Sequence, residues 1–253
     1  MAEAGAKPEP TADEILASVV IPVKDEEESI ASLAEEITRA MDAGVARWEC
    51  VWIDDGSTDR SLDTLKDLNR RDPRHRFISF ARNSGQSAAF YAGFRAARGL
   101  VIATIDGDGQ NDPADLPAMI RMVRQGAADM VNGYRQQRQD SPARRQASRI
   151  ANGARNFFTG KTVRDVGCST RAFRRECVAY LPKFAGMHRF LPTLASMEGF
   201  TLAEVPVNHR PRKYGESKYS IRNRLWVGLA DLFGVFWLQK RSFEYQIAHR
   251  SKR

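Results

Sequence analysis

LVIATIDGDGQNDP, residues 100–113, decides the fold, because an apolar run passes directly into two carboxylates and an amide at alternate positions. Alternate residues of an extended backbone point the same way, so Asp106, Asp108 and Gln110 would line one side of a strand end. Carboxylate oxygens suit a hard divalent cation, and Gly107 would let a bulky anion approach the backbone. The pattern predicts a site for a metal-bridged diphosphate, as in a nucleotide sugar. The alternative is an ordinary polar turn.

Apolar runs alternate with helical patterns through the first half of the chain. The expected strands cover residues 18–23, 49–54, 76–81, 100–105 and 129–134, and the expected helices cover 29–43, 61–69, 86–98 and 113–125. This alternation predicts an α/β fold with a mostly parallel, Rossmann-like sheet and helices on both faces. Ligands bind such sheets at the carboxyl ends of the strands. The later expected elements are helices at 143–158, 189–198 and 221–239 and a strand at 201–208.

Length and composition favour one large domain with an appendage. The chain has 253 residues, 42% of them hydrophobic, which is enough for a substantial core. Its cysteines, Cys50, Cys168 and Cys177, lack CxxC spacing and indicate neither a disulfide framework nor a zinc site. Residues 1–17 are acidic and contain proline but no apolar h-region. We therefore expect a disordered leader rather than a secretory signal, and a cytoplasmic protein.

The net charge of +8 hides a division between the two halves of the chain. Residues 1–133 carry 15 basic and 23 acidic side chains, whereas residues 134–253 carry 24 basic and 8 acidic ones. The acidic half would hold a metal and its ligand. The basic half predicts an anionic partner, which could be a phosphate, a lipid headgroup surface or a nucleic acid.

Polar segments also follow the first two expected strands. VIPVKDEEESI, residues 20–30, places a lysine and several carboxylates beside the end of the sheet, and WIDDGSTD, residues 52–59, follows the second strand. A carboxylate at this strand end, Asp54 or Asp55, could accept a hydrogen bond from a nucleobase and so discriminate between bases. In the alternative interpretation this segment caps the next helix, with Ser57 or Thr58 as the cap. The absence of GxGxxG argues against a Rossmann dehydrogenase.

Five segments together resemble family 2 GT-A glycosyltransferases in their order and spacing: VIPVKDEEESI, WIDDGSTD, RNSGQSAAFYAGF, DGDGQNDPADLP and RKYGESKYS. More narrowly, they resemble the polyprenyl-phosphate branch, which is similar to dolichyl-phosphate mannose synthase. The resemblance implies that residues 18–220 form a GT-A catalytic domain. It also implies a UDP- or GDP-sugar donor, Mg²⁺ or Mn²⁺ as cofactor, and inverting transfer to an undecaprenyl- or dolichyl-type phosphate by a metal-dependent hexosyltransferase.

The resemblance implies roles on the donor side, position by position. Asp108 and Gln110 match the metal ligands. Asp106 matches a contact to the ribose or sugar, and Asp55 matches the carboxylate that reads the base. The matching donor-binding set comprises Pro22, Lys24, Glu26, Ile53, Asp55, Asp106, Gly107, Asp108, Gln110, Arg212 and Lys218. The matching catalytic set comprises Asp106, Asp108, Arg212 and Lys218.

The chain departs from the family pattern at two positions after the first strand. Lys24 stands where the family usually has a tyrosine near the base, and Asp25 stands where asparagine is usual. These replacements leave the identity of the nucleobase open. A lysine could lie over the base or reach a phosphate.

Basic residues in the second half match two further functions of the family. RPRKYGESKYS, residues 210–220, resembles a mobile loop that closes over the donor diphosphate, where Arg212 and Lys218 would stabilise the leaving group. The alternative is a solvated basic loop.

Arg135, Arg144 and Ser148 match the residues that hold the acceptor phosphate, and the alternative for them is the charged face of a solvated helix. A phosphate monoester is ionised near neutral pH, so its attack on the sugar needs no general base. His188 is expected to be a structural histidine.

The expected last helix and the basic tail after it, residues 221–253, form a separate part of the chain. The apolar run at 225–238 is interrupted by Asp231. This run is too short and too polar to span a bilayer comfortably. Aromatic residues with flanking Arg and Lys predict an amphipathic helix at a membrane interface. It could instead dock beside a separate membrane protein, form a homodimer, or pack as a core helix.

The leading hypothesis is therefore an enzyme peripheral to the inner, cytosolic face of a membrane. One alternative keeps the fold but changes the acceptor to a hydroxyl of a glycan or lipid-linked saccharide, which would need a base. A remote alternative is a basic nucleic-acid-binding module. No RRM-, KH- or zinc-finger-like pattern supports it, so we expect no nucleic-acid partner.

Overall fold

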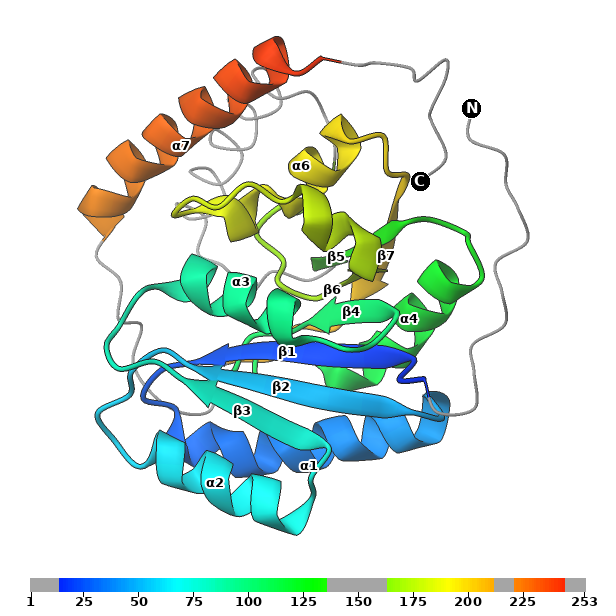
Figure 1. The fold of residues 1–253 in the computed structure, drawn as a ribbon, viewed down its shortest axis with the longest axis vertical. Coiled ribbons are helices and arrows are strands. Elements are labelled where there is room, and N and C mark those ends of the chain that lie inside the picture. Colours follow the sequence, from blue (N-terminus) through cyan, green and yellow to red (C-terminus); the bar gives the residue numbers. More distant parts are fainter. Residues whose placement is uncertain (1–13, 136–162, 212–220, 244–253) are drawn as a thin grey trace, which may run out of the picture. The chain divides into compact units, whose positions relative to one another are not determined.

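The computed structural model describes residues 14–135, 163–211 and 221–243. Contacts divide the chain into two units, residues 1–139 with 163–217 and residues 140–162 with 218–253. The first contains a seven-stranded sheet, and the described part of the second is a single long helix (Figure 1).

The sheet has the strand order β3-β2-β1-β4-β6-β5-β7. All neighbouring strands are parallel except β6, which is antiparallel to both β4 and β5. The strands are β1 (Ala17–Val23), β2 (Trp48–Asp54), β3 (His75–Ser79), β4 (Val101–Thr104), β5 (Met130–Arg135), β6 (Arg171–Arg174) and β7 (Leu202–Val207). The expected mostly parallel sheet is thus confirmed.

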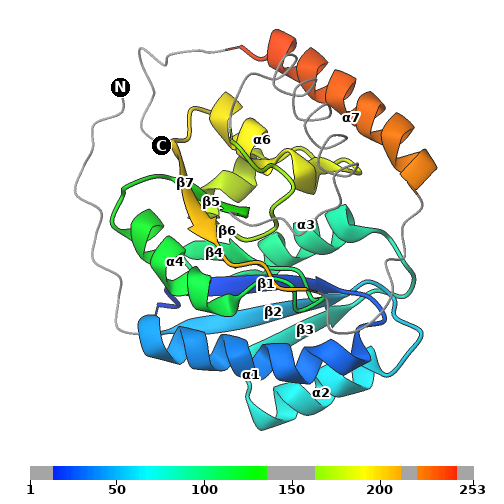
Figure 2. The same cartoon turned by 180° about the vertical axis from the view of Figure 1, so that it is seen from behind.

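Helices cover both faces of the sheet, as expected (Figures 1 and 2). One face carries α1 (Glu27–Gly44), α2 (Ser61–Arg71) and α4 (Leu116–Arg124), which follows the short helix η1 (Pro113–Asp115). The other face carries α3 (Gln86–Ala96). The segment after β6 forms η2 (Arg175–Tyr180), η3 (Met187–Arg189) and α6 (Leu191–Met197).

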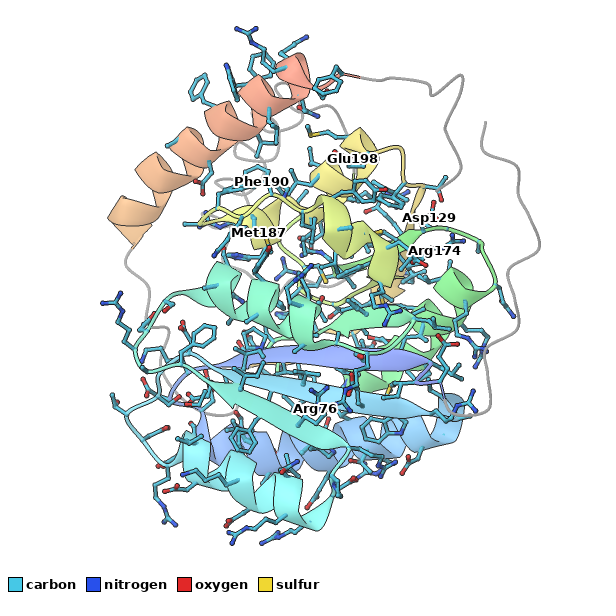
Figure 3. All side chains as sticks on the ribbon, viewed as in Figure 1. Arg76, Asp129, Arg174, Met187, Phe190 and Glu198 are labelled. Atoms are coloured by element: carbon cyan, nitrogen blue, oxygen red, sulfur yellow. The ribbon has the colours of Figure 1, made fainter. Side chains whose placement is uncertain are left out.

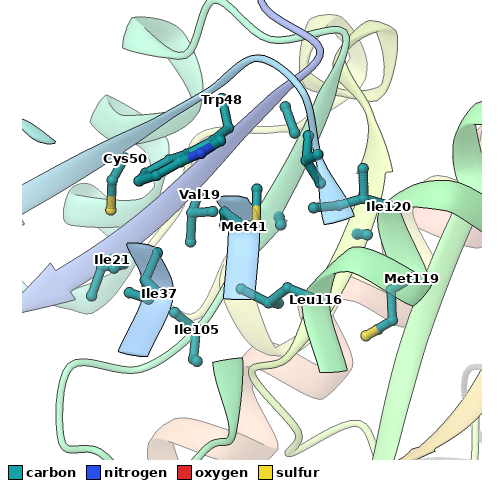
Figure 4. Close-up of a cluster of buried hydrophobic side chains, with 14 of the residues drawn as sticks. Val19, Ile21, Ile37, Met41, Trp48, Cys50, Ile105, Leu116, Met119 and Ile120 are labelled. Atoms are coloured by element: carbon teal, nitrogen blue, oxygen red, sulfur yellow. The ribbon is translucent and has the colours of Figure 1, made fainter. Parts of the chain in front are cut away.

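The alternating side chains of β1 show why two layers of helices form. Val19 and Ile21 are fully buried in one core with α1, where Ile37 and Met41 recur at helical spacing (Figure 4). Val20 points to the opposite face, where a Cβ on Gly93 of α3 would lie only 2.3 Å from its Cγ1. Glycine therefore lets α3 pack close to the sheet.

Three details differ from the expectations. β6 was not expected from the sequence, because RAFR is short and its partners are distant in sequence. The expected helix at 113–125 begins as η1 and becomes regular only at Leu116. Leu16 is buried and β1 begins at Ala17, one residue before the expected strand at 18–23. The expected helix at 143–158 lies outside the described residues.

The expected C-terminal helix is α7 (Ile221–Arg241). Leu232 and Val235 are buried, whereas Phe233 and Trp237 are 55% and 61% exposed. In the part of the chain that the structure describes, none of the helices has both the length and the apolar character needed to cross a bilayer. The placement of the boundaries of the leader, the catalytic domain and this helix stays a prediction.

Candidate active site

The polar segments singled out in the sequence follow the carboxyl ends of β1, β2 and β4. The chain passes from β1 to its neighbour β2 on one side, and β4 lies on the other side of β1. The strand order therefore reverses beside β1, which is where α/β sheets leave a crevice for ligands. The segments after these strands come together there, as predicted.

The turn after β4 packs tightly on the end of β1. A Cβ on Gly107 would lie 2.6 Å from Cγ1 of Val23 and 2.9 Å from the carbonyl oxygen of Pro22. The Gly107 carbonyl accepts a hydrogen bond from Oγ of Ser29 on α1 at 2.7 Å. Glycine is thus required sterically, and this contact fixes the height of the flanking carboxylates above the sheet.

Asp106 lies in an environment that disfavours its negative charge. Burial, and to a smaller extent the nearby charge of Asp108, raise the pKa of its carboxyl to about 6. A hydrogen bond from Ser169 and the positive charges of Arg171 and Arg135 act in the opposite direction. Its Oδ1 also accepts a hydrogen bond from Nε2 of Gln86, 3.0 Å away, at the start of α3.

Gln110 is held by Arg210, the residue at which the expected basic loop begins. The backbone N–H of Arg210 donates to the Gln110 carbonyl at 2.7 Å, and Nε2 of Gln110 donates to the Arg210 carbonyl at 3.4 Å. The backbone N–H of Gln110 donates to Oδ1 of Asp108 at 3.1 Å. Asp108 and Gln110 therefore share one compact turn.

The chemistry of this turn fits a divalent cation. Asp106 and Asp108 are close enough for one charge to shift the pKa of the other, and a cation would relieve that repulsion. Since Nε2 of Gln110 already donates to Arg210, its Oε1 is the amide atom left to serve as a hard ligand. Among the described residues, no group of three or more His, Cys, Asp and Glu side chains is arranged to hold a metal. A cation here would rely on the Asp108 carboxylate, the Gln110 amide and oxygens of a ligand, with the charge of Asp106 nearby.

Asp55 is almost fully buried and anchors the loop before α3. Its Oδ1 accepts the N–H of Ser84 at 2.6 Å, and its Oδ2 accepts the N–H of Gly85 at 2.9 Å. The side chain of Ile53 is fully buried and faces α3, since a Cβ on Gly93 would lie 3.2 Å from its Cγ1. Ile53 thus belongs to the core beneath the expected donor pocket.

Lys24 and Asp25 bind the segment after β2. Nζ of Lys24 donates to the Gly56 carbonyl at 3.2 Å and lies 3.4 Å from Oδ2 of Asp25. Asp25 has a φ of 49°, which Asp and Asn tolerate better than other residues. Its N–H donates to Oγ of Ser57, and its Oδ1 accepts the N–H of Thr58 at 2.7 Å. Lys24 and Asp25, the two residues that depart from the family pattern, therefore connect the segment after β1 to the segment after β2.

The interpretation of Ser57 or Thr58 as the N-cap of the next helix is wrong. Helix α2 begins at Ser61, and its N-cap residue is Arg60, whose side chain makes no capping hydrogen bond. Asp59 instead accepts the N–H of Ser61 at 2.9 Å. Glu26 also contacts this segment, since its N–H donates to Oγ of Ser61 at 2.8 Å.

Arg135, at the end of β5, lies near enough to Asp106 to lower the pKa of that carboxyl. Its guanidinium makes a bidentate ion pair with Asp165, with Nε 2.7 Å from Oδ2 and Nη2 2.9 Å from Oδ1. The other expected cations and acceptor contacts lie outside the described residues: Arg144, Ser148, Arg212 and Lys218.

The sequence reasoning missed Gln86, Asp165 and Arg171. The first contacts Asp106, the second pairs with Arg135, and the third is a buried arginine on β6. Only the pairing of β6 brings the last two to this end of the sheet. His188 has structural contacts, because its Nδ1 lies 2.7 Å from Oγ of Ser87 and its ring stacks on Phe90.

Comparisons with known proteins identify the family of the chain. Residues 18–181 match the model of glycosyl transferase family 2. Dodecaprenyl-phosphate galacturonate synthase of Rhizobium johnstonii is 36% identical over 227 residues, which cover 88% of this chain and 67% of that protein. Undecaprenyl-phosphate 4-deoxy-4-formamido-L-arabinose transferase of Edwardsiella ictaluri is 39% identical over 206 residues, which cover 81% of this chain and 63% of that protein. The chain thus spans close to two thirds of the length of these curated relatives.

Solved structures share the fold. Glucosyl-3-phosphoglycerate synthase from Mycobacterium tuberculosis, in complex with Mn²⁺, UDP and glucosyl-3-phosphoglycerate, superposes with a TM-score of 0.66 and 18% identity. The superposition covers 89% of this chain and 80% of that one. The expected GT-A fold is confirmed, and so is the expected resemblance to family 2. The chain therefore belongs to glycosyl transferase family 2.

Proposed function

We propose that this protein transfers a sugar from a nucleotide-diphosphate sugar to a polyprenyl phosphate, with inversion at the anomeric carbon. The observation that carries the proposal is the turn of Asp106, Asp108 and Gln110, which lies within electrostatic reach of Arg135. In this proposal the donor diphosphate would bind at the turn, and the acceptor phosphate would bind near Arg135 at the same end of the sheet. The printed names of the curated relatives describe transfer to dodecaprenyl and undecaprenyl phosphate in those proteins.

On the donor side, the proposal gives each described residue a separate task. Asp108 and Gln110 would hold Mg²⁺ or Mn²⁺, which would neutralise charge on the leaving diphosphate. Asp106 would face the sugar portion of the donor, in the orientation that Gln86 fixes. Asp55 would meet the base. Arg212 and Lys218 keep the roles that the sequence predicts for them.

On the acceptor side, the positive charge of Arg135, held in place by its pair with Asp165, would attract the phosphate. The acceptor is already ionised near neutral pH and would attack the anomeric carbon directly, so no residue has to remove a proton. A hydroxyl acceptor would need a base. Both oxygens of Asp165, the carboxylate beside Arg135, accept hydrogen bonds from that arginine. This pairing favours the phosphate acceptor.

The proposal extends to the membrane surface through α7. Phe233 and Trp237 are exposed one helical turn apart, and Lys240 and Arg241 follow at the end of the helix. Aromatic and basic side chains in this order suit an interface of anionic headgroups. We expect sedimentation with vesicles that contain phosphatidylglycerol and not with purely zwitterionic vesicles. Equal sedimentation of the Trp237→Ala variant with anionic vesicles would count against this surface and favour a protein partner or a second copy.

The enzymatic test uses purified protein, a polyprenyl phosphate and a donor chosen by thermal shift from UDP-, GDP-, CMP- and dTDP-sugars with Mn²⁺. Asp108→Asn should abolish formation of the lipid-linked sugar, because it removes a charged ligand without changing the size of the side chain. Asp67→Asn, which changes an exposed aspartate on α2 that pairs with Arg70, is the matched control and should retain activity. Full transfer by Asp108→Asn would refute the proposed function of the turn.

A further inference from the structure

Arg171, the first residue of β6, is a buried arginine whose guanidinium joins three separate segments. Nε donates to Oδ1 of Asn132 on β5 at 2.8 Å. Nη1 donates to the carbonyl of His188 at 2.8 Å, and Nη2 donates to the carbonyl of Val166 at 2.7 Å. The residue is 3% exposed, so it is shielded from any ligand in the crevice.

Burial of the charged guanidinium has a large desolvation cost, so these contacts contribute little net stability to the fold. All three acceptors are neutral groups, and burial lowers the pKa of Arg171 although the charges of Asp106 and Asp165 oppose this effect. A hydrophobic side chain of similar volume often stabilises a protein as well as, or better than, a buried charge. The placement of three segments by one planar fork explains better why an arginine stands here.

Two of the three segments belong to the expected acceptor side. Val166 follows Asp165, which holds Arg135 in the bidentate pair. Nδ2 of Asn132 donates to the Asp165 carbonyl at 3.2 Å, and Asn132 lies on the same strand as Arg135. Arg171 therefore fixes the backbone on both sides of that pair.

The third segment leads to the donor side. His188, whose carbonyl accepts from Arg171, lies with Nδ1 2.7 Å from Oγ of Ser87 in the first turn of α3. The preceding residue is Gln86, whose Nε2 donates to Asp106 at 3.0 Å. A continuous path of hydrogen-bonded segments thus runs from the Asp106 carboxylate to the Arg135–Asp165 pair through Arg171.

We propose that Arg171 is a positioning residue, which sets the placement of the Arg135–Asp165 pair relative to the Asp106 carboxylate. This inference rests on the proposed function, in which Arg135 meets the acceptor phosphate. It predicts that loss of the guanidinium displaces the Arg135–Asp165 pair. The positions of Asp108 and Gln110 and the contacts of Asp55 should stay as they are. The affinity for the acceptor should then change separately from the affinity for the donor.

The test compares Arg171→Lys with the wild type, using undecaprenyl phosphate and the nucleotide sugar identified by thermal shift. Lysine keeps the charge but cannot reach three acceptors in a plane, so the KM for the lipid phosphate should rise roughly tenfold or more. The KM for the donor should stay within about twofold, because the packing of Gly107 on β1 and the contacts of Gln110 with Arg210 hold the turn without Arg171.

Arg174→Lys is the matched control on the same strand. Arg174 lies beside Asp129 (Figure 3), with Nε 3.0 Å from Oδ1, and β6 runs away from the site toward it. The control should leave both KM values unchanged.

A second variant keeps the inference testable if Arg171→Lys does not fold. Asn132→Asp is isosteric and retains an acceptor for Nε of Arg171, but it lacks the N–H that reaches the Asp165 carbonyl. It should also raise the KM for the lipid phosphate alone.

The outcomes separate the two proposals. If the wild type forms no lipid-linked sugar, the proposed function fails and the role of Arg171 falls with it. If the wild type is active and Arg171→Lys and Asn132→Asp change neither KM, or raise both equally, the positioning role alone is overturned.

Discussion

Replacement of Gly107 by alanine tests whether close packing on β1 positions the carboxylates of the turn. The new Cβ would lie 2.6 Å from Cγ1 of Val23 and 2.9 Å from the Pro22 carbonyl oxygen. Carbon atoms in contact prefer about 3.5–4.0 Å, so the overlap amounts to about 1 Å. Val23 is buried and β-branched, and the Pro22 oxygen belongs to the backbone, so neither can move aside easily. The turn itself would have to shift.

Such a shift has a thermodynamic and a kinetic consequence. Overpacking of a buried contact typically costs about 1–3 kcal/mol, and the hydrogen bond from Ser29 to the Gly107 carbonyl would stretch as well. A displacement of about 1 Å at reacting groups can lower the rate about 10²-fold. We expect urea denaturation to show the first loss and the kcat/KM for sugar transfer to show the second.

Gly199→Ala separates loss of activity from simple loss of stability. Gly199 has a φ of +80° with nothing within 4 Å of an added Cβ, so alanine there is strained but meets no neighbour. It should cost about 1 kcal/mol of stability and leave kcat/KM unchanged. If Gly107→Ala kept the wild-type stability and kcat/KM, the packing of the turn on β1 would not be what positions the carboxylates.

Three further predictions concern pH, the base contact and the metal. Burial lowers the pKa of His75 from 6.5 to about 4, and its Nδ1 accepts the indole N–H of Trp52 at 3.1 Å. The unfolded chain therefore binds a proton between pH 6.5 and 4 that the folded chain excludes, so stability should fall by about 3 kcal/mol as the pH decreases across this window. In urea denaturation His75→Asn should flatten that slope, and an unchanged slope would contradict the assignment. Asp55→Asn replaces one acceptor oxygen by an N–H donor facing the backbone N–H of Ser84 or Gly85. This change should cost about 1–3 kcal/mol in urea denaturation and raise the KM for the donor, and a wild-type KM would exclude a role in base recognition. Mn²⁺ should raise the melting temperature in the presence of a nucleoside diphosphate, EDTA should reverse the rise, and no metal-dependent shift would argue against a cation at the turn.

Much of the fold follows from local patterns. The strands β1, β2 and β4 are nearly continuous apolar runs, as expected when both faces of a sheet are covered, and their ends agree with the sequence prediction to within one residue. The turn after β4 could also be predicted, because Asp-Gly and Asn-Asp-Pro are turn signals and follow directly after an apolar run.

The contacts of the predicted site residues depend on tertiary structure. Asp55 was expected to face a base, but its two oxygens accept N–H groups from the loop before α3. Arg135 was expected at a phosphate, and it pairs with Asp165, a residue without any signal of its own in the sequence. In both cases the partner lies about thirty residues away along the chain, and only the order of the strands brings it near.

The sequence by itself determined the parallel sheet, the family and the acidic turn, because these depend on short-range alternation and on segments that keep their order. Only the tertiary structure decided that β6 enters the sheet antiparallel between β4 and β5. That placement puts Arg171 opposite Thr104 and Asn132, next to the turn where Asp106 lies. Four residues with two arginines give no periodic signal, and their burial is favourable only when strands and loops from distant parts of the chain supply hydrogen-bond acceptors for the charge.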